Sequence, residues 1–124
     1  MRKKNCSTII NVNSVYGSLA PDWDLYKGTE INDPAAYSTS KAGLLQLTHY
    51  LATTLSPEIR VNCFSIRGIK RNQPSKFVNR YINKTPIGRM AREEDFKGIV
   101  AFFASDLSKY MTGQNLIIDG GRSI

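Results

Sequence analysis

Residues 8–13, Thr-Ile-Ile-Asn-Val-Asn, and residues 60–65, Arg-Val-Asn-Cys-Phe-Ser, are two short segments with apolar centres. Segments of this length without strict alternation are typical of strands that are buried in a parallel sheet. Between these segments, leucines recur at spacings of three, four and four residues, at Leu44, Leu47, Leu51 and Leu55. This spacing predicts the apolar face of an amphipathic helix. The strand–helix–strand order predicts an α/β fold with parallel strands and right-handed crossovers.

Turn and capping signals divide the rest of the chain. Residues 15–32 carry Gly17, Pro21 and Gly28 and predict a long irregular loop. Asp33 is expected to be the N-cap of the following helix, with Pro34 in its first position and Pro57 after its end.

Two further helices and a last strand are predicted in the C-terminal part. Residues 72–84 form a helix of mixed polarity, and the acidic residues 93–95 suit the start of another helix. The expected buried stripe of that helix is Phe96, Ile99, Val100 and Phe103. Residues 116–118, Leu-Ile-Ile, predict the third strand.

Three polar residues around the first crossover suggest acid–base chemistry. Tyr37 and Lys41 lie four residues apart, on one face of the predicted helix, and a nearby ammonium favours the ionised form of a phenol whose pKa is ordinarily ~10. Ser14 lies 23 residues before Tyr37, at the carboxyl end of the first strand, where ligands bind in open α/β sheets. A tyrosine and a lysine at this spacing also occur on solvated helix faces, so the surrounding sequence has to decide.

The surrounding sequence resembles the short-chain dehydrogenase/reductase (SDR) family, and its end is similar to the classical branch. The stretches that carry the resemblance follow one another in the family's order, at residues 9–17, 37–43, 59–62, 86–89, 103–106 and 112–121. The resemblance implies the C-terminal part of a Rossmann-type doubly wound parallel sheet. Residues 1–124 would form a single partial domain with strands 5–7 of the full fold.

The resemblance also implies roles for individual residues. Tyr37 would be the catalytic acid–base, Ser14 would polarise the substrate oxygen, and Lys41 would hold the nicotinamide ribose while lowering the pKa of the tyrosine. Tyr37 and Lys41 would thus both contact the cofactor, with Gly68 and Ile69 as candidates for contact with the nicotinamide carboxamide. The chain has Ile-Arg at residues 66–67 where most relatives have Pro-Gly, which makes a tight nicotinamide contact uncertain.

The N-terminal part of the family's pattern is not found. None of the nine glycines forms G-x-G-x-x-G, the turn that binds dinucleotide phosphates. We therefore expect the N-terminal cofactor-binding half to be absent from this chain and its site for NAD or NADP to be incomplete. One hypothesis is an NAD(P)-dependent oxidoreductase that reduces a carbonyl or oxidises a secondary alcohol through Ser-Tyr-Lys chemistry. The other is a truncated, non-catalytic fragment or interaction module that pairs with a full-length homologue.

Two features bear on the substrate. The interval between Ser14 and Tyr37 resembles that of the family branch that acts on nucleotide sugars, whereas residues 119–121, Asp-Gly-Gly, match the classical branch. Together these features indicate a classical enzyme with an enlarged loop and a sugar-like substrate. Nine basic residues cluster in the segment expected to cover the substrate, and they favour either an anionic substrate or a solvated basic face: Arg67, Lys70, Arg71, Lys76, Arg80, Lys84, Arg89, Arg92 and Lys97.

Composition sets the remaining expectations. The 124 residues suit one domain, and no apolar stretch reaches the ~20 residues that span a bilayer, so we expect a cytoplasmic protein without a membrane partner. The net charge of +7 comes without a nucleic-acid-binding motif. Cys6 and Cys63 lack metal-ligand spacing and are expected to be free buried thiols, and His49 is expected to be a packing or surface residue. The apolar free edge of the first strand predicts a homo-oligomer or pairing with an N-terminal half.

Overall fold

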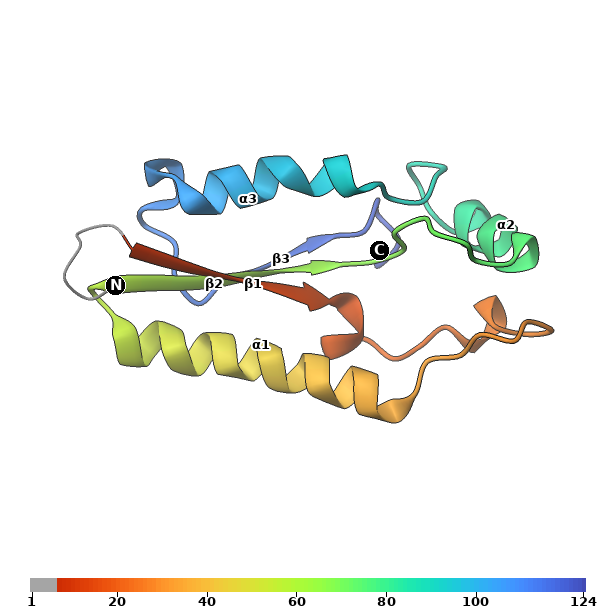
Figure 1. Cartoon of the computed structure of the whole chain (residues 1–124), viewed down its shortest axis with the longest axis horizontal. Coiled ribbons are helices and arrows are strands. Elements are labelled where there is room, and N and C mark those ends of the chain that lie inside the picture. Colours follow the sequence, from red (N-terminus) through yellow and green to blue (C-terminus); the bar gives the residue numbers. More distant parts are fainter. Residues whose placement is uncertain (1–6) are drawn as a thin grey trace.

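The computed structural model describes residues 7–124 as a three-stranded parallel sheet between two helical layers (Figure 1). The strands β1 (Ser7–Ser14), β2 (Ile59–Ile66) and β3 (Asn115–Ile118) follow one another in the order β1-β2-β3. Helix α1 (Ala35–Leu55) covers one face of the sheet and α3 (Lys97–Ala104) the other. The predicted α/β class, and the parallel sheet with its three strands, are confirmed.

The register brings the carboxyl ends of the strands together. Ser14 pairs with Ile66, and Ile66 pairs with Ile118. The loops that follow β1 and β2 therefore leave the sheet at the same end, and helix α2 (Ser75–Asn83) lies beyond that end (Figure 1). This helix is shorter than the predicted segment 72–84.

The face of α1 that packs against the sheet is centred on a polar residue. Thr48 is fully buried, and its hydroxyl donates to the Leu44 carbonyl and accepts from the Asn11 side-chain amide, both at 2.9 Å. Leu47 is exposed, so the prediction that it belongs to the buried stripe is wrong. The amide of β1 and the hydroxyl of α1 thus form a polar contact between the strand and the helix. The apolar contacts of α1 lie closer to its C-terminal end, around Ala52, Ile59 and Val61.

The start of α1 also differs from the prediction. Pro34 is the N-cap residue, and no side chain caps the helix. Asp33 is buried, and its carboxylate accepts a hydrogen bond from the Ser38 hydroxyl at 2.8 Å. Asp33 thus stabilises the first turn through a side chain rather than through the backbone N–H groups that an N-cap would satisfy.

The opposite face of the sheet is aromatic. Phe64 from β2 packs with Phe96 and Phe103, which flank α3 at its start and near its end. The acidic segment forms a 3-10 turn, Glu93–Phe96, ahead of α3, and Val100 is exposed, so its assignment to the buried stripe is wrong.

Arg60 holds the loop between α3 and β3. Its guanidinium donates to the carbonyl oxygens of Ser108 at 2.8 Å, Met111 at 3.2 Å and Phe103 at 3.2 Å. The side chain of Asn62 donates to the Met111 carbonyl as well. The motif at residues 59–62 therefore acts as a structural clamp on this loop.

The loop after β1 folds back over α2. It contains the 3-10 turns Val15–Gly17 and Trp23–Leu25, and Leu25 packs on Phe77 and Tyr81 of α2. The predicted loop at residues 15–32 is therefore present, with a small core of its own.

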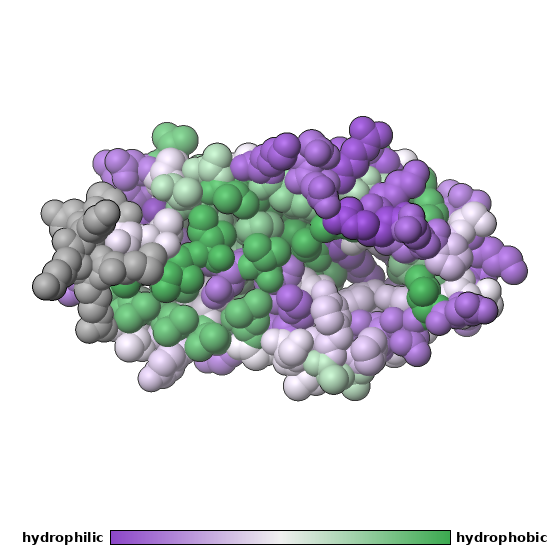
Figure 2. All heavy atoms as spheres, viewed as in Figure 1, coloured by the Kyte–Doolittle hydropathy of each residue, from purple (hydrophilic) through white to green (hydrophobic). Residues whose placement is uncertain are grey.

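Polar and apolar surfaces are unevenly distributed. Figure 2 shows hydrophobic side chains gathered between the two helical layers, on the side where β1 forms the edge of the sheet. Val12 of β1 is 50% exposed.

Within residues 7–124, no helix is long and apolar enough to cross a membrane, and no three His, Cys, Asp or Glu side chains come together as a metal site would require. Cys63 is a buried free thiol, and Cys6 lies outside the described residues.

Candidate active site

A cavity of 290 Å³ opens where β1, α1 and the segment after β2 meet, at the carboxyl edge of the sheet. Ser14 lines it from the end of β1 and Tyr37 from the first turns of α1. Gly68 and Ile69 line it from the segment after β2. Four of the five predicted site residues therefore share one cavity.

The two hydroxyl groups differ in their surroundings. Ser14 is buried, and its oxygen accepts a hydrogen bond from the backbone N–H of Tyr16 at 3.2 Å. Tyr37 is 41% exposed. The serine is thus held by the turn that follows β1, and the tyrosine is accessible to a ligand.

Lys41 lies one helical turn beyond Tyr37. Its Nζ is 5.6 Å from the centroid of the Tyr37 ring, and it donates a long hydrogen bond of 3.5 Å to the Val12 carbonyl oxygen. The backbone of β1 thereby keeps the Lys41 ammonium near the ring of Tyr37.

Gly17 permits a close approach between the loop and α1. A Cβ atom at this position would lie 2.7 Å from the Lys41 carbonyl oxygen and 3.1 Å from the side-chain nitrogen of Asn13. The turn after Ser14 therefore packs directly on the helix backbone that carries Lys41.

The segment after β2 is fixed by its own backbone. The Ala91 N–H donates to the Gly68 carbonyl at 2.9 Å, and the Gln73 side chain donates to the Ile69 carbonyl at 2.8 Å. Gly68 has a φ of 66°, a left-handed conformation that suits glycine. The glycine requirement of this turn thus falls on Gly68, and Arg67 precedes it as a side chain that reaches the cavity.

The aromatic residues of the cavity other than Tyr37 were not predicted as site residues. The Tyr16 and Tyr26 hydroxyls lie 2.9 Å apart, and burial together with the bond to Tyr16 raises the pKa of Tyr26 above its ordinary range. Tyr81 of α2 is only 2% exposed, and burial raises its pKa to about 12. The Arg67 guanidinium carbon lies 5.1 Å from the centroid of the Tyr16 ring.

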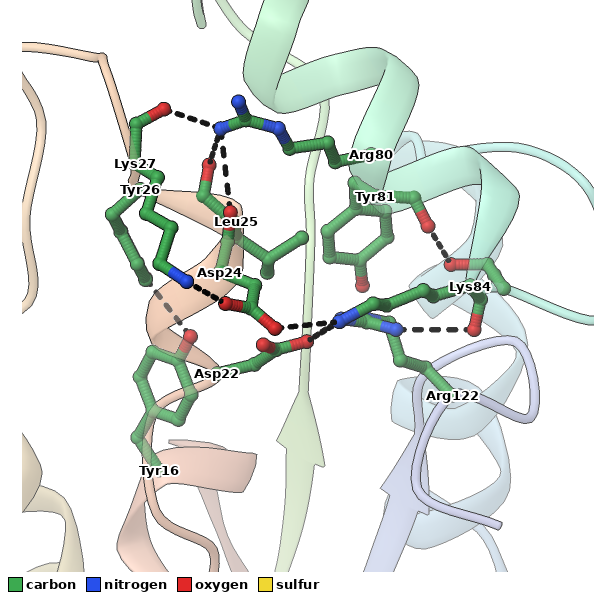
Figure 3. Close-up of polar contacts among 11 residues, drawn as sticks. Tyr16, Asp22, Asp24, Leu25, Tyr26, Lys27, Arg80, Tyr81, Lys84 and Arg122 are labelled. Carbon is green, nitrogen blue, oxygen red and sulfur yellow. Dashed lines mark hydrogen bonds and ion pairs between the residues drawn. The ribbon is translucent and has the colours of Figure 1, made fainter.

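An ionic network fastens the loop after β1 to α2 and to the end of the chain (Figure 3). Asp22 pairs with Lys84 at 2.9 Å and with Arg122 at 2.6 Å. Burial alone would raise the pKa of Asp22, but the two cations outweigh it and lower that pKa. The Arg80 guanidinium donates to backbone carbonyls of the same loop, among them that of Asp24 at 3.3 Å. This network thus fixes the position of α2, which contributes Phe77 and Tyr81 to the lining of the cavity.

Comparison with known proteins identifies the fold and the family. A family model described as enoyl-(acyl carrier protein) reductase matches residues 1–123. The crystal structure of a short-chain dehydrogenase from Leptospira borgpetersenii serovar Hardjo-bovis, with bound NAD+, is 47% identical and superposes with a TM-score of 0.87 over 94% of this chain. The chain belongs to the short-chain dehydrogenase/reductase family.

Curated SDR relatives are longer than this chain. The post-translational flagellin modification protein A of Campylobacter coli is 36% identical over 97% of the chain, and a 3-oxoacyl-(acyl-carrier-protein) reductase of Chlamydia pneumoniae is 32% identical over 98%. The match covers 47% of each relative, and 44% of the Leptospira dehydrogenase. The chain thus spans about half the length of the SDR proteins that it matches.

Proposed function

We propose that this chain contributes the catalytic half of an NAD(P)-dependent oxidoreductase that reduces a carbonyl or oxidises a secondary alcohol. The observation that carries the proposal is the shared cavity of Ser14 and Tyr37, with the Lys41 ammonium 5.6 Å from the tyrosine ring. The predicted roles of these residues remain part of the proposal.

In this proposal, each hydroxyl has one task at the substrate oxygen. The Tyr37 hydroxyl gives a proton to that oxygen during reduction, and its phenolate takes the proton back during oxidation. Because the Ser14 oxygen already accepts the Tyr16 N–H, its own hydrogen is left to donate to the substrate oxygen, where negative charge develops.

The residues around the cavity are compatible with the nicotinamide end of the cofactor. Lys41 and Tyr37 would contact its ribose, and the backbone of Gly68 and Ile69, which lines the cavity, would contact its carboxamide. When bound, the nicotinamide supplies or accepts the hydride. The phosphate-binding turn that this family places in its N-terminal half would come from residues outside this chain.

Cofactor binding is the first test. Trp23 is exposed in the loop that borders the cavity, and the fluorescence of this single tryptophan should transfer to bound NADH or NADPH. We expect saturable energy transfer with one of the two cofactors when the chain is completed by the family's N-terminal half. Absence of binding by the completed protein to both cofactors would contradict the proposal and favour an interaction module.

The catalytic role of the tyrosine requires a second measurement. In the completed protein, Tyr37→Phe should lower kcat by at least ~100-fold, because general acid–base catalysis contributes about that much. His49→Gln is a suitable control, since His49 is exposed on α1 and does not line the cavity. Retained turnover in Tyr37→Phe would exclude the tyrosine as the acid–base.

A further inference from the structure

Two hydrogen-bond donors beside the candidate active site have no partner. The Nε–H of Arg67 and the hydroxyl of Tyr81 are both buried and unpaired in the part of the chain that the structure describes. Both residues line the cavity that contains Ser14 and Tyr37. Buried donors without acceptors cost free energy. The other buried side-chain atoms without a partner among the described residues belong to Asn13 and Arg122, which do not line this cavity.

The charge of this cavity is unbalanced. Its lining residues include no aspartate and no glutamate, and Arg67 is its one cation. A neighbouring cavity of 240 Å³ shares Arg67 and Tyr81 but also contains Asp95 and Asp119. The positive charge of Arg67 is therefore uncompensated on the side of Ser14 and Tyr37.

Arg67 differs in this from five of the other basic residues between Arg67 and Lys97; Lys70, Lys76 and Arg92 also have no carboxylate partner, but they are exposed and do not line the cavity. Arg71 pairs with Glu93, and Arg89 forms a bidentate pair with Asp95 at 2.7 and 2.8 Å. Lys84 and Lys97 also have carboxylate partners, and Arg80 donates to backbone carbonyls. Among residues 7–124, no carboxylate lies within ion-pair distance of Arg67.

Both donors are held in place by their neighbours. The Arg67 guanidinium lies over the Tyr16 ring, a cation–π contact that orients a planar cation. A Cβ atom at Gly68 would lie 2.1 Å from the Tyr81 hydroxyl oxygen, so the glycine backbone packs directly on that hydroxyl. The two groups are thus positioned before any ligand arrives.

We propose that Arg67 and Tyr81 bind an anionic group, a carboxylate or a phosphate, of the substrate whose carbonyl or alcohol lies at Ser14 and Tyr37. This inference rests on the proposed oxidoreductase function and names its substrate class. Guanidinium groups bind carboxylates and phosphates through charge-assisted hydrogen bonds. The Tyr81 hydroxyl, with a pKa of about 12, keeps its proton at neutral pH and donates it to the same group.

Anion binding can be measured without cofactor or turnover. Inorganic phosphate and acetate are titrated separately into the folded chain, and the Arg67 Nε–H resonance is followed by NMR. We expect saturable shifts with one or both anions, and the preferred anion distinguishes a phosphate from a carboxylate. Absence of a saturable shift with both anions overturns the proposal.

Three variants test the assignment to these residues. Arg67→Gln, followed through the Tyr81 resonances, should weaken anion binding by ~10-fold or more, the effect of losing a charge-assisted hydrogen bond. Tyr81→Phe should weaken it by ~3-fold to 10-fold, since a neutral hydrogen bond is lost. Arg71→Gln is the matched control and should leave binding unchanged, because Arg71 is exposed, already paired and outside the cavity. Equal losses in Arg67→Gln and Arg71→Gln would indicate general electrostatic attraction and overturn the proposal.

The two proposals fail in different ways. Anion binding that depends on Arg67 in a protein that transfers no hydride would reject the oxidoreductase proposal and leave the anion site standing. Turnover of neutral carbonyls with the same KM as their carboxylated or phosphorylated analogues would reject the anion site and leave the oxidoreductase proposal standing.

Discussion

At the residue scale, the Tyr81→Phe substitution distinguishes a role of the Tyr81 hydroxyl in anion binding from a role in stability. Its hydroxyl is buried without a partner, so Tyr81→Phe removes an unsatisfied polar group and keeps the ring that packs on Phe77. We expect the free energy of unfolding to stay constant or to rise by up to ~1 kcal/mol, because the desolvation cost of the hydroxyl disappears. Urea denaturation of both proteins measures this change.

Tyr26→Phe provides the matched control for this prediction. The Tyr26 hydroxyl has a partner at 2.9 Å in Tyr16, so its removal should cost ~1 kcal/mol. A loss in Tyr81→Phe as large as that in Tyr26→Phe would show that the Tyr81 hydroxyl has a stabilising partner after all. If loss of the Tyr81 hydroxyl weakens anion binding without lowering the free energy of unfolding, the hydroxyl serves the ligand and not the fold.

Sequence reasoning reaches some site residues and not others, for a physical reason. Tyr37 and Lys41 are related by the local geometry of one helix, and Ser14 ends a recognisable strand, so short-range patterns make all three candidates, and the family resemblance supplies their expected roles. Tyr81 is brought to the cavity by the packing of α2 on the distant loop that carries Leu25. No local pattern distinguishes Tyr81 from a core tyrosine.

At the scale of elements, the contact between the loop after β1 and α1 depends on Gly17. Gly17→Ala would place a methyl carbon 2.7 Å from the Lys41 carbonyl oxygen, a backbone atom of α1. The helix or the loop must shift, and we expect a loss of ~1–3 kcal/mol in the free energy of unfolding, as for overpacked sites. Thermal denaturation of both proteins tests this.

Gly43→Ala is the control for this substitution. Gly43 lies within α1, and no atom comes within 4 Å of a Cβ built there. Alanine should therefore stabilise the helix by ~0.5–1 kcal/mol through its higher helix propensity. If both alanine variants changed stability in the same direction, the loop would not depend on the close approach at Gly17.

The errors of prediction at this scale have one origin. Apolar spacing assigns Leu47 and Val100 to buried stripes, but the sheet determines which side of each helix faces it. Thr48, which accepts a hydrogen bond from the Asn11 amide of β1, lies on the buried face of α1, and Leu47 lies away from that face. Asp33 fails as an N-cap because a side-chain partner, Ser38, takes its carboxylate. Asn11 lies across a packing interface from Thr48, and Ser38 is a local side-chain partner of Asp33, and neither kind of contact leaves a periodic signal.

At the scale of the whole molecule, the α/β class and the parallel pairing of the strands follow from sequence because alternating strands and helices admit few arrangements. The observed order β1-β2-β3 places β1 at an edge of the described sheet, beside the hydrophobic face in Figure 2. Family relatives are about twice as long as the chain. We predict that this chain corresponds to strands 5–7 of the full fold, in which case a strand of the other half would cover this edge.

The edge of β1 should therefore drive self-association of the chain. Strand β1 has eight residues and presents a longer row of edge backbone groups than the four-residue β3. We expect light scattering after size-exclusion chromatography to report a mass above that of one chain. Val12→Glu should shift the distribution toward monomer, because a charge on an edge strand opposes pairing with another strand.

Ile117→Glu distinguishes the two edges of the sheet. Ile117 on β3 is 48% exposed, nearly the same as the 50% of Val12, so the two substitutions add the same charge at similar exposure. If β1 is the associating edge, Val12→Glu lowers the mass and Ile117→Glu does not. The reverse result would assign association to β3, and an unchanged mass in both variants would locate it on the helices. A monodisperse monomer of the unmodified chain with a sharp cooperative melt would contradict edge association altogether, because the apolar edge would then be stable in water without a partner.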